Sequence, residues 1–362
     1  MHKKLLVLIS SLSSGGAERQ MIKLLEFLNE KGYKPTVITY SNRQDYEHKL
    51  DINRINIQGK GIKRYLQIIK VIKGDKPDVM LSYGQNANII LILLSFFYSK
   101  AKVVVSGRNT PPKYDFLVWR ILNLYRFADS IILNSFSQTE FIKKYAPFLT
   151  SKLITISNFT DVTQYSFRIK QRESTLKIGI LARYHPQKNI MRFLEAIKML
   201  NYSLAQPIEY YWYGQKYYDA NGSPTQASQY YLQCEMYREK EALRNVFLND
   251  FSNDTITILQ TIDIFCLPSL YEGFSNALSE AICCGKPILA SDVSDNKYFV
   301  ENGKNGFLFE PCNVLDIVEA ITKFALLSQE ELMQYQKNSR IIAEKLFSKE
   351  QFLQLNLKTL FN

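Results

Sequence analysis

Two glutamates, Glu272 and Glu280, stand eight positions apart in a segment whose chemistry suits a phosphorylated polyol. An apolar run precedes the segment, and Ser275 and Asn276 lie between the two acids. The pattern predicts a strand, a tight loop with Gly273, and then a helix. Backbone N–H groups at a helix start attract anions. The two carboxylates, one near the loop and one about two turns along the helix, can bind hydroxyl groups. Together with the anion-binding helix start, they indicate a polyhydroxylated ligand that carries phosphate.

Two isolated glutamates would more often be a helix cap and a solvated surface residue, so other motifs must decide. Gly15 and Gly16 follow an apolar strand at 5–9 and precede a helical pattern, and paired glycines let a backbone approach a phosphate closely. Arg183 and Lys188 follow a second apolar strand at 176–181. A guanidinium fork and an ammonium point charge together suit phosphate oxygens.

These motifs resemble those of the retaining glycosyltransferases of family 4, which have the GT-B fold. The resemblance occurs in family order and spans nearly the whole chain. It rests on Gly15-Gly16-Ala17-Glu18, on Arg183 with Gln187-Lys188-Asn189, on the segment from Glu272 to Glu280 with Gly273-Phe274 and Asn276-Ala277, and on 296–311. The last of these looks like the turn and hairpin that follow the acidic motif in this family.

The resemblance implies a role for each matched residue. Arg183 and Lys188 neutralise the donor diphosphate, and their contacts strengthen as charge builds on the leaving group. Glu272 lies by the sugar ring and Glu280 binds the nucleotide ribose. The other donor-binding positions are Gly15, Gly16, Gly273, Phe274, Ser275, Asn276 and Ala277. The resemblance also implies retention of configuration, with a phosphate oxygen taking the acceptor proton, and it calls for no metal and no cofactor.

The loop after the fourth predicted strand departs from the family pattern. It reads Gly107-Arg108-Asn109-Thr110-Pro111, and its Arg-Asn-x-Pro part resembles the bacterial surface-polysaccharide branch of the family. Many relatives carry an acid where Gly107 stands, which leaves the choice of donor open. Arg108 and Asn109 are candidates for contacts to the sugar or to an acceptor phosphate. A structural role for Arg108 at the sheet edge is the alternative.

The chain order of strands and helices predicts two doubly wound parallel sheets that face each other across a cleft. The first series of strands is expected at 5–9, 36–40, 79–83, 103–106 and 130–134. The second is expected at 177–181, 209–213, 262–267 and 287–290. An acceptor-side domain is therefore predicted at 1–168 and a nucleotide-sugar domain at 174–346. The resemblance places the last helix, about 347–362, on the first domain. The loop 215–229 receives no role.

Composition restricts the class of protein. With 46% apolar and 22% charged residues, the 362-residue chain is predicted to be a folded two-domain protein. The longest apolar stretch, 89–98, is too short to span a bilayer. The apolar run at 5–9 is too short for a signal peptide and lacks a cleavage site, so it is expected to be the first strand. Five cysteines without Cys-x-x-Cys spacing indicate reduced thiols in the cytoplasm. Three scattered histidines offer no metal-ligand set.

Positive charge is concentrated in the first half of the chain. Residues 1–165 contain 24 Lys and Arg against 12 Asp and Glu, whereas residues 166–362 contain 21 and 22. The stretch 60–76 interleaves Lys and Arg with apolar residues, and Lys143, Lys144 and Lys152 add to the charge. Near an anionic bilayer each such charge contributes about 1 kcal/mol. The alternative is a diffuse charge that serves solubility. No nucleic-acid recognition motif accompanies it.

We therefore expect a hexosyltransferase that moves a sugar from a UDP-hexose or UDP-N-acetylhexosamine to a polyprenyl-diphosphate-linked glycan. The product would be O-antigen, capsule or glycoprotein glycan, and the enzyme would lie in the cytoplasm at the inner face of an anionic membrane. The alternatives are a sugar-nucleotide epimerase of the same fold and a non-catalytic sugar-binding protein. A nicotinamide dehydrogenase is disfavoured, because the first glycine loop lacks the Gly-x-Gly-x-x-Gly pattern.

Overall fold

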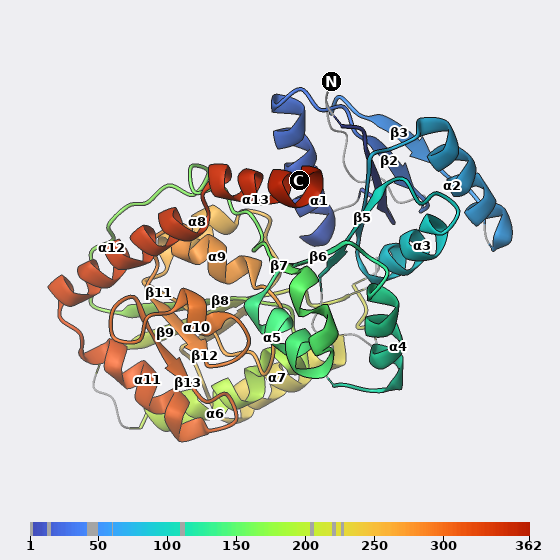
Figure 1. Cartoon of the computed structure of the whole chain (residues 1–362). Helices are drawn as coiled ribbons and strands as arrows, with labels where there is room; N and C mark the ends of the chain where they lie inside the picture. Colours follow the sequence, from blue (N-terminus) through green and yellow to red (C-terminus); the bar gives the residue numbers. More distant parts are fainter. Residues whose placement is uncertain are drawn as a thin grey trace. The chain divides into compact units, whose positions relative to one another are not determined.

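The chain folds into two α/β units, each built on one parallel sheet (Figure 1). The computed structural model describes residues 3–12, 16–41, 50–59, 61–108, 113–202, 206–218, 222–225 and 228–362. The first unit runs to Phe159 and resumes at Ser348, and the second runs from Thr160 to Phe347. The sequence places the join later, at 168–174. In the structure, Val162 and Tyr165 already pack into the core of the second unit.

The first unit contains a seven-stranded parallel sheet within the described residues, in the order β3-β2-β1-β4-β5-β6-β7. The middle strands are apolar on both faces because helices cover both. Val7, for example, lies between Val37 and Leu81 in the register. The strands are β1 (Leu5–Ile9), β2 (Thr36–Thr39), β3 (Asn53–Asn56), β4 (Val79–Tyr83), β5 (Lys102–Gly107), β6 (Ser130–Leu133) and β7 (Leu153–Thr155).

Helices cover the two faces of this sheet unequally. One face packs against α2 (Ile62–Asp75), α3 (Gln85–Ser95), α4 (Phe116–Tyr125) and α5 (Phe136–Tyr145), which the 3₁₀ segment Pro147–Lys152 follows. The other face packs against α1 (Gly16–Glu30) and against the last helix of the chain, α13 (Lys349–Phe361). Phe27 of α1 and Phe352 of α13 meet edge to face, with ring centroids 6.2 Å apart. The final helix is therefore part of the first core.

The second unit repeats this design with six described strands, in the order β10-β9-β8-β11-β12-β13. They are β8 (Leu176–Leu181), β9 (Ile208–Tyr213), β10 (Val246–Asn249), β11 (Ile264–Leu267), β12 (Ile288–Ser291) and β13 (Gly306–Phe309). One face packs on α6 (Ile190–Leu200), α7 (Gln229–Lys240) and α11 (Val314–Leu326). The other packs on α8 (Thr255–Thr261), α9 (Asn276–Cys283), α10 (Asn296–Phe299) and α12 (Gln329–Leu346).

Both strand orders reverse at one point, and these points matter for binding. In the first sheet the order reverses between β1 and β4, and in the second between β8 and β11. Ligands of doubly wound sheets bind outside the carboxyl ends of strands at such reversals. The loop with Arg183 and Lys188 follows β8, and the segment with Glu272 follows β11. The prediction of two doubly wound sheets is confirmed, and the second sheet brings the motif loops to its own reversal.

The hairpin predicted for 296–311 is wrong. The segment forms the short helix α10, a turn with Gly303 at φ 77°, and β13, which lies parallel to β12. The side chain of Asn305 explains the difference, because it accepts a hydrogen bond from the backbone of Glu301 and donates one to the carbonyl of Phe299. These bonds close the turn on itself, so its two arms do not pair as antiparallel strands.

The end of α9 buries a lysine. Gly285 adopts φ 70° after the helix, and Lys286 then turns inward and is only 3% exposed. Its Nζ donates to the carbonyl of Ile262 at 2.9 Å. Burial, and secondarily the nearby charge of Lys170, lower the pKa of Lys286 from 10.5 to about 8. The folded chain therefore releases this proton at a lower pH than the unfolded chain does.

Lys286→Met tests this burial. Between pH 8 and pH 10.5 the unfolded wild type binds more protons at this position than the folded protein, so Lys286 makes stability rise with pH. We expect the free energy of unfolding of wild type, relative to the Met variant, to rise by up to about 3 kcal/mol across this window. Denaturant unfolding at a series of pH values measures it, and a constant difference would contradict the burial.

Candidate active site

The loop after β8 alternates between exposed and anchored side chains. Arg183 is exposed and makes no ion pair or hydrogen bond with the described part of the chain. Tyr184 turns into the core, where its hydroxyl donates to the carbonyl of Asn249 at 2.7 Å. His185 caps the 3₁₀ turn Pro186–Lys188 by accepting from the backbone of Gln187. Tyr184 therefore anchors the loop in the core, while Arg183 faces solvent.

Hydrogen bonds join this loop to the loop after β11. The backbone N–H of Leu270 donates to the carbonyl of Gln187 at 2.8 Å. The side-chain amide of Gln187 donates in turn to the carbonyl of Tyr271 at 2.7 Å. Residues more than eighty positions apart in the sequence are thus held in one rigid patch at the carboxyl edge of the sheet.

A short ion pair lies at the centre of this patch. Lys188 Nζ lies 2.5 Å from Glu272 Oε1, and the two side chains are only 14% and 8% exposed. The hydroxyl of Ser269 donates to the same carboxylate oxygen at 2.6 Å. A buried charge is costly unless it is paired and hydrogen-bonded, and both conditions hold here. The structure therefore brings together Lys188 and Glu272, which the resemblance places at the donor diphosphate and at the sugar ring.

Ser294 fixes the backbone of Glu272. Its hydroxyl accepts from the Glu272 N–H at 3.1 Å and donates to the Glu272 carbonyl at 2.6 Å. Ser294 itself has φ 50°, a left-handed conformation that a non-glycine residue adopts only when its surroundings hold it there. Sequence reasoning missed both Ser294 and Ser269. The one signal available was the cluster of turn-forming residues that follows β12.

The start of α9 has the form predicted for an anion site. Ser275 is the N-cap, and its hydroxyl accepts from the N–H of Leu278 at 3.3 Å, so Asn276 and Ala277 form the first turn. The ring of Phe274 packs edge to face on Phe299, with centroids 5.4 Å apart. Phe274 therefore anchors the loop on the core of the second unit.

Glu280 lies further along the same helix, beside a tyrosine that sequence reasoning did not single out. Burial, and then the neighbouring Glu280 carboxylate, raise the pKa of Tyr165 well above its usual value, while Thr255 opposes the shift. Tyr165 is buried and Glu280 is half-buried. The two motif glutamates thus have different neighbours, an ammonium for Glu272 and a phenol for Glu280.

The first unit gathers a separate cluster where β1, β4 and β5 end. Arg108 Nη1 donates to the Tyr83 hydroxyl at 3.1 Å, Nη2 donates to Asn158, and the guanidinium carbon lies 4.5 Å from the centroid of the Tyr83 ring. Burial lowers the pKa of Arg108, and Tyr83 and then Glu18 oppose that shift. Its Nε is buried and has no hydrogen-bond partner among the described residues. Arg108 is therefore held at the reversal of the first sheet by Tyr83 and Asn158, and both the ligand contact and the structural role stay predictions.

Gly107 stands where a side chain has little room. A Cβ at this position would lie 2.9 Å from Leu133 Cδ2 and 3.0 Å from Gln138 Nε2. The space that a family acid would use is therefore filled by other side chains. Of the remaining predicted residues, Gly16 begins α1, whereas Gly15 and Asn109 lie outside the described residues.

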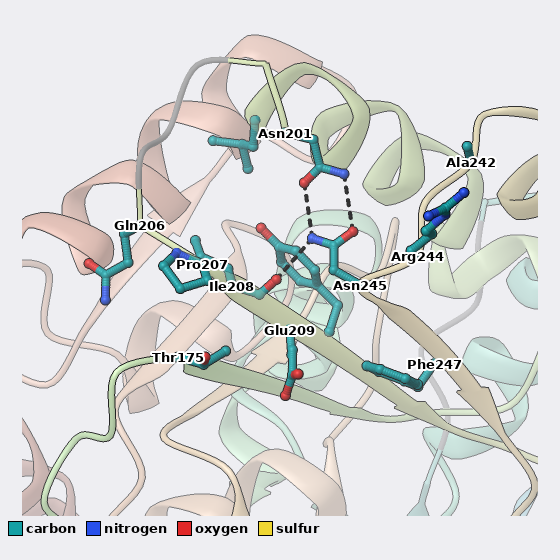
Figure 2. Close-up of a pocket in the computed structure, with 12 residues that line it drawn as sticks. Thr175, Asn201, Gln206, Pro207, Ile208, Glu209, Ala242, Arg244, Asn245 and Phe247 are labelled. Atoms are coloured by element: carbon teal, nitrogen blue, oxygen red, sulfur yellow. Dashed lines mark hydrogen bonds between the residues drawn. The ribbon is translucent and has the colours of Figure 1, made fainter.

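An open hollow of about 510 Å³ in the second unit lies at the opposite edge of the sheet, where β8, β9 and β10 begin (Figure 2). Asn201 and Asn245 exchange two amide hydrogen bonds there, at 3.0 and 2.9 Å, and Asn245 also donates to the carbonyl of Ile208. These polar groups form hydrogen bonds with one another. The hollow also lies where the strands begin, whereas ligands of this kind of sheet bind at the carboxyl ends of the strands. We therefore place the candidate site at the Lys188–Glu272 pair and not in this hollow.

The described residues contain neither a cluster of metal ligands nor a membrane-spanning helix. No group of three or more His, Cys, Asp or Glu side chains among them is arranged to hold a metal ion. No helix in the same residues combines the length and apolarity needed to cross a bilayer. The sequence expectation that no metal takes part stays a prediction.

The family assignment follows from a match over half of the chain. The family model described as glycosyl transferases group 1 matches residues 161–341, half of the chain. The match lies within the second unit and includes Arg183, Lys188 and the segment from Glu272 to Glu280. The chain belongs to this family, and the protein is a glycosyltransferase. Its fold is GT-B, as predicted. The structure of Anabaena Alr3699/HepE in complex with UDP superposes with a TM-score of 0.81 over 98% of this chain and 99% of that chain, at 19% identity.

Two curated relatives align with about three quarters of the chain. The chain is 25% identical over 281 residues, 73% of its length, to 70% of the Escherichia coli UDP-Gal:alpha-D-GlcNAc-diphosphoundecaprenol alpha-1,3-galactosyltransferase. It is 20% identical over 292 residues, 77% of its length, to 76% of a Campylobacter jejuni enzyme. That enzyme is the GalNAc-alpha-(1->4)-GalNAc-alpha-(1->3)-diNAcBac-PP-undecaprenol alpha-1,4-N-acetyl-D-galactosaminyltransferase.

Substitutions at Ser294 test how the Glu272 loop is held. Ser294→Ala removes two hydrogen bonds but keeps the left-handed backbone, so we expect it to lower the free energy of unfolding by about 1–3 kcal/mol. Ser294→Gly removes the same bonds but relieves the backbone strain, so it should cost less. Denaturant unfolding ranks the two variants. Equal stability of wild type and the Ala variant would contradict the role of the hydroxyl.

Gly107→Glu tests why the family acid is absent. The new side chain meets Leu133 and Gln138, and we expect overpacking to cost about 1–3 kcal/mol of unfolding free energy. The matched control is Gly74→Glu on α2 in the same unit, where nothing lies within 4 Å of an added Cβ. Helix propensity favours that change, so the control should unfold no more easily than wild type. Tolerance of Glu at both positions would contradict the steric explanation.

Proposed function

We propose that this protein transfers a hexose or N-acetylhexosamine, with retention of configuration, from a UDP-sugar to a polyprenyl-diphosphate-linked glycan in the assembly of a bacterial surface polysaccharide or glycoprotein glycan. The observation that carries the proposal is the ion pair of Lys188 and Glu272 at the strand-order reversal of the second sheet. That is where this fold binds the phosphates of a nucleotide.

The relatives support the choice of substrates. The Escherichia coli relative is named for UDP-Gal and for a GlcNAc-diphosphoundecaprenol acceptor. The Campylobacter jejuni relative is named for an acceptor on diphosphoundecaprenol. The Anabaena structure contains UDP. Each of these three similar proteins is thus named for a uridine nucleotide, a lipid-linked glycan or both.

The charges of the site suit a departing diphosphate. Lys188 has three N–H donors and uses one of them in the hydrogen bond to Glu272, so it can also donate to a phosphate oxygen. Arg183 is exposed on the same loop and offers a planar fork. Negative charge grows on the leaving group as the glycosidic bond breaks, and these cations then stabilise it more strongly. In this proposal they do the work that a divalent metal does in other transferases.

The Glu272 carboxylate has a free acceptor for the sugar. Lys188 and Ser269 both bond to Oε1, so Oε2 remains able to accept from a sugar hydroxyl within the described site. Glu280, two turns along α9, is proposed to bind the ribose. The first turn of that helix, with Ser275, Asn276 and Ala277, is proposed to face the phosphates.

The acceptor is proposed to meet the first unit. This unit contains 26 Lys and Arg against 12 Asp and Glu, a net charge of +14, whereas the second unit has a net charge of −3. Arg108 is its buried cation at the strand-order reversal, and we propose that it contacts an acceptor or sugar phosphate. A unit of this charge suits an anionic membrane face that carries a lipid-linked glycan.

Lys188→Met and Glu272→Gln test the proposal. Each removes one charge of the pair, and we expect transfer from UDP-sugar to a lipid-linked acceptor to fall by about 10²-fold or more. A coupled assay that measures UDP release with and without acceptor gives the rate, and product that forms only with acceptor excludes an epimerase. Near-normal transfer in either variant would contradict the assignment.

The matched control is Lys198→Met in the same unit. Lys198 lies on α6 and pairs with Glu241 at 2.6 Å on the surface, so its loss should leave transfer near the wild-type rate. Thermal unfolding of every variant, with and without UDP, separates a lost donor site from a lost fold. A ligand that binds only the folded protein raises its melting temperature, and Lys188→Met should abolish that rise while the protein still unfolds cooperatively.

A further inference from the structure

The outward face of α4 is apolar and aromatic. Phe116, Leu117 and Trp119 are 71%, 61% and 46% exposed. The rings of Phe116 and Trp119 stack with centroids 5.6 Å apart, and the guanidinium of Arg120 lies 5.9 Å from the Phe116 ring. The opposite side of the helix packs into the first core. An amphipathic helix of this kind normally has a polar outer face, so the apolar one requires an explanation.

The charge around α4 is almost entirely positive. The segment 85–128 contains six basic residues and a single acid, Asp115. That acid is the N-cap of α4, and its carboxylate accepts from the N–H of Val118 at 2.9 Å. Because the Asp115 carboxylate is bonded to the start of the helix, the basic residues determine the charge of this face. The exposed ones are Lys100, Lys113, Arg120 and Arg126, whereas Arg108 is held by Tyr83 and Asn158 and Lys102 donates to the carbonyl of Thr359.

The neighbouring helices extend this surface. Phe96 and Phe97, just after α3, are both about 60% exposed, and the Phe96 ring meets Phe127, just after α4, at 5.2 Å. On the other side of α3, α2 exposes Ile62 and Leu66 among lysines. Figure 1 shows α2, α3 and α4 in sequence along one side of the first sheet, and all three pack into the same core. The exposed aromatic residues and the basic helix therefore belong to one layer.

We propose that α4 docks on the surface of an anionic lipid bilayer, with Phe116, Leu117 and Trp119 entering the boundary between headgroups and acyl chains. Aromatic side chains favour that boundary, and Arg and Lys beside them pair with anionic headgroups. A second protein would have to match a face with one acid and four exposed cations, whereas an anionic bilayer matches such a face without further design. The purpose of the docking depends on the proposed lipid-linked acceptor, whereas the existence of the apolar face follows only from the exposed residues of α4 and its neighbours.

The position of α4 connects the bilayer to Arg108. The inner side of the helix, with Val118, Ile121 and Leu122, lines a cavity of about 70 Å³ that Arg108 also lines. A helix seated among headgroups therefore holds the buried guanidinium of the first unit close to the plane of lipid phosphates. The exposed face of α2 alone would not fix that distance, because it lies two helices away.

Tryptophan fluorescence tests the docking directly. The chain has two tryptophans, and the other, Trp212, is buried and donates to the carbonyl of Ala182 at 2.7 Å. The spectrum of wild type minus that of Trp119→Phe therefore reports Trp119 alone. With vesicles of phosphatidylglycerol and phosphatidylcholine, we expect the emission of Trp119 to shift to shorter wavelength and to be quenched by lipids brominated on the acyl chains. Vesicles of phosphatidylcholine alone should give a much smaller change.

The variant Phe116→Ser with Leu117→Ser should bind the anionic vesicles about tenfold or more weakly, because each large apolar side chain contributes on the order of tenfold to transfer. The control is Leu315→Ser in the second unit, which removes an equally exposed leucine and should bind like wild type. Vesicle binding without any change at Trp119 would overturn the proposal in favour of the basic face of α2. A shift that appears without vesicles and grows with protein concentration would overturn it in favour of a second copy.

The proposed transfer reaction and the proposed membrane docking can be contradicted independently of each other. Phe116→Ser with Leu117→Ser should keep the UDP-induced rise in melting temperature and the turnover of a short-chain acceptor in solution. Absence of turnover in wild type, with Trp119 still entering the bilayer, would contradict the proposed transfer reaction alone. Full turnover with an unresponsive Trp119 would contradict the docking alone.

Discussion

The ion pair of Lys188 and Glu272 is the interaction on which the candidate site depends. Two largely buried charges are tolerable only if they neutralise each other and find hydrogen bonds, and the residues of the two adjoining loops meet that requirement. Gln187 ties the two loops together, Ser269 supplies a hydroxyl, and Ser294 holds the backbone of the acid. The carboxyl ends of β8 and β11 bring these loops to the same place.

Such a site is pre-organised for a change in charge. Lys188 is already largely buried and oriented by Glu272 before a ligand arrives, so in the proposed reaction it does not need to reorganise when negative charge develops. The conformation of Ser294 shows that local backbone strain is accepted to maintain this geometry. The first unit follows a comparable rule with a different residue, because Arg108 is held by Tyr83 and Asn158 at its own strand-order reversal.

The sequence was sufficient to predict the architecture and the position of the motif loops. Apolar strands that alternate with helices specify parallel sheets, and the residues after each strand must then lie at one edge, so Lys188 and Glu272 could be expected at a common site. Their direct pairing could not be expected, because it depends on side-chain burial. The bonds made by Ser294 depend on a turn whose shape is set by tertiary contacts. The hairpin predicted at 296–311 rests on the family resemblance alone, and the parallel pairing of Gly306–Phe309 with β12 depends on tertiary contacts that the motif does not specify.

A structure of the protein with a bound UDP-sugar tests the central claim most directly. The account predicts the diphosphate at the carboxyl edge of the second sheet, within hydrogen-bond distance of Lys188 and Arg183, with the sugar beside Glu272. A diphosphate in the hollow between Asn201 and Arg244, or one that contacts neither cation, would contradict it.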